Sequence, residues 1–106
     1  MNDATRDHGV QPVEALMERW GLTAHQLVEN SEEQLNHKQV QRARKGRKLT
    51  LHLMQKVTRA VNDAIFKSLP AAKRADFVPY FHRHLFNYAK GYDSSWSDPN
   101  DALCPK

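Results

Sequence analysis

The side chains that best suit a function lie between residues 36 and 48, and the function that they suit is the binding of a polyanion. It contains six Lys and Arg residues and no acidic residue. Asn36 is a favoured N-cap residue, Gln39 stands three positions later as in a capping box, and Gly46 suits a helix end. Because Val40 and Ala43 lie one turn apart, we predict a short helix that buries both and turns its polar side outward. A solvated charged helix without a ligand would show the same pattern.

The distribution of charge along the chain favours the binding interpretation. The net charge is +4 over 106 residues. Residues 1–36 hold seven acidic and two basic residues, a net charge of −5, whereas residues 37–67 hold nine basic residues and one acidic residue, a net charge of +8. Basic charge gathered in one part of a chain is typical of a surface that binds phosphates. Basic stretches also bind acidic proteins and membranes, so charge alone does not identify the partner.

The elements that must position this stretch are predicted to be helices. The length suits one domain, the composition favours helix, and no alternating stretch is long enough for a sheet. We therefore predict an all-α bundle of four to six helices. Apolar spacing and cap residues divide the chain into a disordered N-terminus (1–11), a four-helix domain (12–69), an aromatic helical extension (70–91) and a disordered tail (92–106).

Several classes of function are not expected. A single cysteine, Cys104, excludes a disulfide or a cysteine-based zinc site within one chain, and His82 and His84 point to different sides of a helix. No catalytic triad, phosphate-binding loop or pair of carboxylates stands out, so we expect no enzyme, no metal, no cofactor and no small-molecule ligand. Apolar stretches are too short to span a bilayer. We expect a cytoplasmic protein without a membrane segment.

Two short helices at a steep angle, the second basic and capped, form a helix-turn-helix when flanking helices support them. The sequence over residues 12–66 resembles lambda-repressor-like (Cro and phage-repressor type) helix-turn-helix domains. The residues that carry the resemblance are Leu16, Gly21, Leu22, Thr23, Leu27, Val28, Leu35, Val40, Arg42, Ala43, Gly46, Arg47, Lys56, Val57, Ala60, Val61 and Asn62. The chain departs from the family at Val28, where a small residue is usual, and at Arg44, where an acid is common. The turn over residues 30–34 is longer by two residues and lacks a glycine.

The resemblance implies a small transcriptional regulator that binds double-stranded DNA with the basic helix in the major groove. The base contacts that it implies are Asn36, His37, Lys38 and Gln41. The phosphate contacts are Thr23, Arg42, Arg44, Lys45, Arg47 and Lys48. As the alternative, the same helix would dock an acidic protein partner or RNA.

The aromatic segment after Pro79 has two interpretations. Its large side chains could close the core over the first and fourth helices, or they could form the interface of a homodimer, where aromatic residues are enriched. The candidate interface residues are Tyr80, Phe81, Leu85, Phe86 and Tyr88. They surround a helix too broadly for one contact face, so both interpretations can hold. A dimer would suit modules that bind two DNA half-sites about one turn apart.

Overall fold

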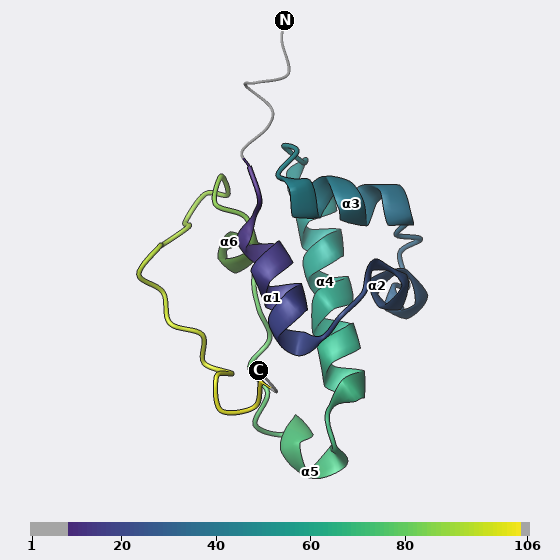
Figure 1. Ribbon diagram of the computed structural model, residues 1–106, viewed down its shortest axis with the longest axis vertical. Helices are drawn as coiled ribbons and strands as arrows, with labels where there is room; N and C mark the ends of the chain where they lie inside the picture. Colours follow the sequence, from purple (N-terminus) through teal and green to yellow (C-terminus); the bar gives the residue numbers. More distant parts are fainter. Residues whose placement is uncertain (1–8, 105–106) are drawn as a thin grey trace, which may run out of the picture.

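The computed structural model describes residues 9–104, and within this range the chain forms six helices and no β-strand (Figure 1). The helices are α1 (Pro12–Trp20), α2 (Ala24–Asn30), α3 (His37–Lys45), α4 (Leu51–Ser68), α5 (Ala71–Arg74) and α6 (His82–Leu85). The prediction of an all-α chain of four to six helices is confirmed. Residues 1–8 of the predicted disordered N-terminus lie outside the described residues, as do residues 105–106 of the predicted tail.

Local hydrogen bonds set the boundaries of α2 and α3, as the sequence predicts. Gln26 N donates to Thr23 Oγ1 at 3.2 Å, and Thr23 N donates to Gln26 Oε1 at 2.7 Å. The same reciprocal pair joins Asn36 and Gln39, at 2.8 and 3.1 Å. Each capping box satisfies two backbone groups that a helix start would otherwise leave open. Gly46 ends α3 with a φ of 92°, a left-handed conformation that favours glycine.

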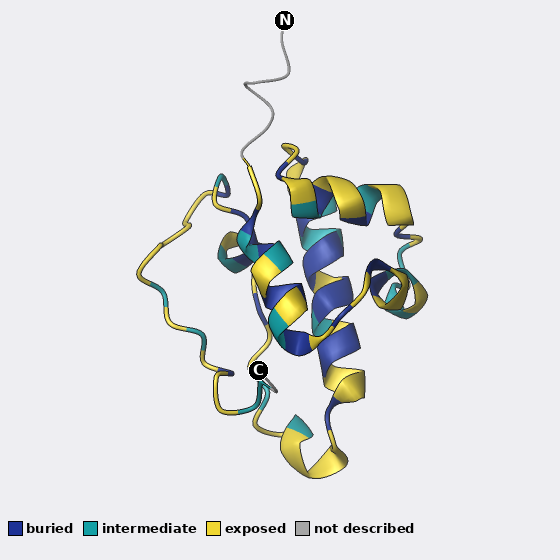
Figure 2. Ribbon diagram, in the orientation of Figure 1, coloured by how far each residue is buried: buried dark blue, intermediate teal, exposed yellow. Residues whose placement is uncertain are grey.

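The long helix α4 is the centre of the core. Its side chains at Val57, Val61 and Ile65 are fully buried, and the helix contacts α2, α3 and α6. In turn, α1 contacts α3 and α6 (Figure 1). Figure 2 shows the buried stripe of α4 and the exposed outer side of α3. The packing therefore holds α3 at one end of the bundle with one side free.

The extended turn between α2 and α3 is ordered by two features. Gln34 takes a left-handed conformation with a φ of 59°, a position at which glycine would be expected. Glu33 accepts two hydrogen bonds from Arg59 of α4, at 2.6 and 2.5 Å. These contacts connect the turn to the central helix.

The structure corrects the dimer-interface prediction for three of its five residues. Tyr80, Leu85 and Phe86 are at most 2% exposed and belong to the core of the chain itself, because α6 packs against α1 and α4. Tyr88 is half-buried, and its hydroxyl accepts a hydrogen bond from Leu49 N at 3.0 Å. Only Phe81 remains well exposed, at 53%.

The segments that flank the bundle also differ from the sequence prediction of disorder. Gln11 is buried, and its Oε1 accepts a hydrogen bond from Asn87 N at 2.7 Å. In the predicted disordered tail, Asn100 is fully buried and bonds both to Val78 N, at 2.9 Å, and to Val78 O, at 2.8 Å. Residues 9–11 and 92–104 thus have a defined course, because single polar side chains attach them to distant parts of the backbone.

Candidate nucleic-acid interface

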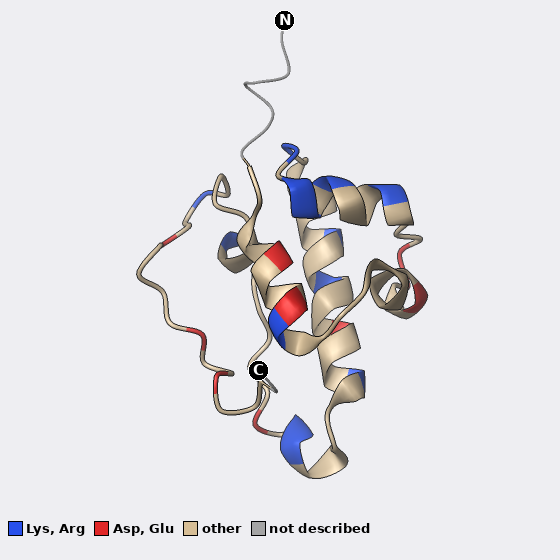
Figure 3. Cartoon of the chain, viewed as in Figure 1, with Lys and Arg blue, Asp and Glu red and all other residues tan. Residues whose placement is uncertain are grey.

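The exposed side of α3 is a basic groove. Val40 and Ala43 have no exposed surface, so the opposite side of the helix faces outward. A shallow groove of about 320 Å³ is lined there by Lys38, Gln41, Arg42, Lys45 and Arg47. These five residues, hereafter the basic groove, include four cations and no acid. Figure 3 shows basic residues along α3 and the loop after it, whereas acidic residues lie on α1, around α2, on α4 and along the C-terminal segment.

The four predicted base contacts lie together at the start of α3. His37, Lys38 and Gln41 are exposed. Asn36 is exposed too, but its Oδ1 already accepts the hydrogen bond from Gln39 N. A base contact by Asn36 would therefore share its side chain with the cap of α3.

Of the predicted phosphate contacts, Arg42, Lys45, Arg47 and Lys48 are exposed on α3 and in the loop after it. Arg44 is different, because its half-buried guanidinium forms an ion pair with Glu14 of α1 through Nε and Oε1. The charge of Arg44 is thus directed toward α1 and away from the basic groove. Thr23 is exposed, but its hydroxyl oxygen serves the cap of α2.

The structure adds one feature that the sequence did not indicate. The imidazoles of His25 and His37 stack with ring centroids 5.8 Å apart and an interplanar angle of 22°. His25 lies in the first turn of α2 and His37 begins α3, so the pair joins the starts of the two helices. No periodic pattern in the sequence predicts a contact between residues that are 12 positions apart. The angle between α2 and α3 creates this contact.

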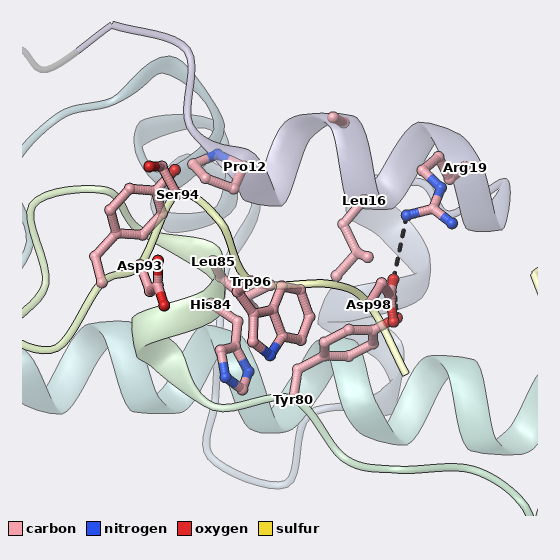
Figure 4. A pocket seen from close by; sticks show the side chains of 12 residues that line it. Pro12, Leu16, Arg19, Tyr80, His84, Leu85, Asp93, Ser94, Trp96 and Asp98 are labelled. Carbon is pink, nitrogen blue, oxygen red and sulfur yellow. Dashed lines mark hydrogen bonds and ion pairs between the residues drawn. The ribbon is translucent and has the colours of Figure 1, made fainter. Parts of the chain in front are cut away.

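A second hollow, the tail cavity of about 180 Å³, lies between α1, α6 and residues 92–98 (Figure 4). Arg19 Nη1 donates to Asp98 Oδ2 at 3.2 Å, and Tyr80 Oη donates to the same carboxylate at 2.7 Å. Burial, together with this hydrogen bond, raises the pKa of Tyr80. The indole of Trp96 lies over the imidazole of His84 with centroids 4.1 Å apart, and burial lowers the pKa of His84. The polar groups here attach the tail to α1, and they form no arrangement of nucleophile and base.

Among residues 9–104, no three His, Cys, Asp or Glu side chains gather as ligands of a metal ion. No helix in the described part of the chain combines the length and the apolar character that crossing a bilayer requires.

No protein-family model, curated protein or solved structure matches this chain.

Proposed function

We propose that this chain binds double-stranded DNA by placing the basic groove of α3 in the major groove, and that it is a small transcriptional regulator in the cytoplasm. In this proposal α2, the turn and α3 act as a helix-turn-helix. One observation carries it: a helix anchored by Val40 and Ala43, together with the loop after it, presents four cations and a glutamine to solvent with no acid among them. A polyanion with hydrogen-bonding groups at regular spacing is the partner that such a surface suits best.

The dimensions of α3 support duplex DNA. An α-helix with its side chains is about 10–12 Å across, and the major groove of B-DNA is about 12 Å wide. Gln41 can pair with adenine through two hydrogen bonds, and Lys38 can donate to guanine. Arg42, Lys45, Arg47 and Lys48 are the proposed phosphate contacts. The functions of reading bases and holding phosphates would thus be divided along α3 and the loop after it.

Two copies are proposed to bind together, because one short helix offers few base contacts. Phe81 is the member of the predicted interface that is still accessible, at 53% exposure. The guanidinium carbon of Arg83 lies over the Phe81 ring, 4.6 Å from the ring centroid. A contact between copies would therefore be centred on Phe81. Sedimentation of wild type and Phe81→Ala tests this point, and a dimer that persists unchanged in the variant contradicts it.

The salt dependence of binding tests the main proposal. Four phosphate contacts per copy should give a log–log slope near 4 per copy for the loss of affinity with salt, about 0.9 for each contact. Arg42→Ala should lower this slope by about 1. Gln41→Ala should weaken binding and leave the slope unchanged. Lys67→Ala is the control, because Lys67 is exposed near the end of α4 away from α3.

The competing partners are separated by the same assay. If the chain does not bind duplex DNA even at low salt, the proposal is overturned and an acidic protein is favoured as the partner. Binding to an RNA hairpin that exceeds binding to a duplex of the same length would favour RNA. We expect the duplex to bind more tightly than the hairpin.

A further inference from the structure

The stacked pair His25 and His37 lies beside the basic groove, because His37 directly precedes Lys38 on α3. Both imidazoles are exposed. Neither the stack nor the contact of His25 with Glu29 buries the two rings in the core. A pair of titratable rings at the edge of a cationic surface is positioned to meet the same polyanion as the groove.

The chemistry of two stacked imidazoles depends on their charge. Two neutral rings stack without penalty, whereas two protonated rings 5.8 Å apart repel each other. An anion that contacts both rings offsets this repulsion. Histidine gains its proton between about pH 8 and pH 5, so the balance changes within an accessible range.

The pair has an acidic neighbour on α2 and a basic neighbour on α3. Glu29, one turn after His25 on α2, lies with its Oε1 3.2 Å from His25 Nε2, and both side chains are more than 60% exposed. Lys38 follows His37 on α3. On α4, which packs against both helices, Arg59, His52 and Lys56 interact with the carboxylate of Glu33. A protonated imidazole has two N–H donors, so His25 can keep Glu29 at Nε2 and offer Nδ1 to another oxygen.

We infer that His25 and His37 together bind a phosphate of the DNA backbone in their protonated form, so that DNA binding by this chain takes up protons. This inference rests on the proposed function and adds a phosphate contact to it. The pair joins the first turns of α2 and α3, so the contact would hold the phosphate next to the end of α3 that is proposed to reach the bases.

The test measures the affinity for a labelled 20-base-pair duplex at pH 6.0, 7.0 and 8.0 and constant ionic strength. One linked proton changes the affinity by up to tenfold per pH unit. We expect the Kd of the wild type to fall by about tenfold between pH 8.0 and pH 6.0. The affinity of the double variant His25→Gln/His37→Gln should change by less than about twofold over the same pH range, whatever its affinity at pH 8.0. His82→Gln, a change on α6 away from the pair, should keep the full pH dependence.

A second measurement counts the protons directly. Calorimetry of DNA binding at pH 6.5 in two buffers with different heats of ionisation should show uptake of about one proton by the wild type and none by the double variant. The inference is overturned if the wild type binds DNA with no pH dependence, or if the double variant keeps the dependence of the wild type. If no duplex is bound at any pH, the proposed function and this inference fail together. Circular dichroism confirms that the variants are folded.

Discussion

Arg59 of α4 and Glu33 of the α2–α3 turn form two parallel hydrogen bonds, from Nε to Oε2 at 2.6 Å and from Nη2 to Oε1 at 2.5 Å. Such a two-point contact fixes both the position and the orientation of the carboxylate. The turn has no glycine and leads directly into α3. The pair therefore connects the turn that leads into α3 to the central helix α4.

Arg59→Gln should lower the free energy of unfolding at pH 7, and the difference from the wild type should disappear in acid. The hydrogen bond from Arg59 is the main reason why the pKa of Glu33 is lowered in the folded chain. A carboxyl group of this kind contributes stability above its ordinary pKa and loses it as the pH falls through the lowered value. Urea unfolding at pH 7 and below about pH 4 measures this. An equal difference at both values would show that the pair does not stabilise the turn, and Lys67→Gln is the control.

Gln34→Gly should raise the free energy of unfolding by up to about 1 kcal/mol. The left-handed conformation destabilises a residue with a Cβ atom by roughly 1–2 kcal/mol. Glycine avoids this destabilisation, but the larger entropy that glycine loses on folding offsets part of the gain. Gln34 has a φ of 59°. Gln34→Ala is the matched control and should bring no gain, because alanine keeps the Cβ atom. A loss of stability in Gln34→Gly would mean that the glutamine side chain itself supports the turn.

Gly46→Ala should destabilise the chain more than Gly21→Ala does. Both glycines have positive φ values, 92° and 67°, so the left-handed conformation should lower the free energy of unfolding of both variants by roughly 1 kcal/mol. A Cβ atom on Gly46 would lie 1.6 Å from the carbonyl oxygen of Gly9, whereas nothing lies within 4 Å of one on Gly21. Thermal unfolding of the two variants gives the comparison. Equal losses would show that residues 9–11 do not pack on the end of α3 in solution.

Arg44→Ala should lower stability and leave the salt dependence of DNA binding unchanged. Its ion pair with Glu14 is half-buried, so its loss should cost about 1 kcal/mol. Arg42→Ala should leave the stability unchanged and lower the salt dependence of DNA binding, because Arg42 is exposed in the basic groove. Chemical unfolding and DNA titration of the two single variants separate the effects. A flatter salt slope in Arg44→Ala would return Arg44 to the phosphate contacts.

His84 should titrate at a lower pH than an exposed histidine. Burial lowers the pKa of His84, with a further lowering from the charge of Arg83. Because the unfolded chain then binds the proton more readily than the folded one, this group should reduce stability as the pH falls below the ordinary histidine value of about 6.5. Nuclear magnetic resonance of the imidazole ring follows the titration. Trp96→Ala exposes His84 and should raise its pKa; an unchanged midpoint would contradict burial as the cause.

The sequence by itself determined the starts of α2 and α3, the end of α3 and the outward side of α3. Thr23 with Gln26 and Asn36 with Gln39 set the starts of α2 and α3, and Gly46 set the end of α3. These signals act between residues at most a few positions apart, so they can be read from a single sequence. The burial of Val40 and Ala43 follows from the helical period in the same way.

The tertiary structure alone decided which cations remain available and where the ends of the chain lie. Arg44 pairs with Glu14, 30 residues away, and Asn100 bonds to the backbone of Val78. Tyr80, Leu85 and Phe86 were equally suited by type to a core or to an interface between copies, and the packing of α6 placed them in the core. Such contacts depend on the angles between helices. Those angles result from packing over the whole chain, and no local pattern of residues encodes them.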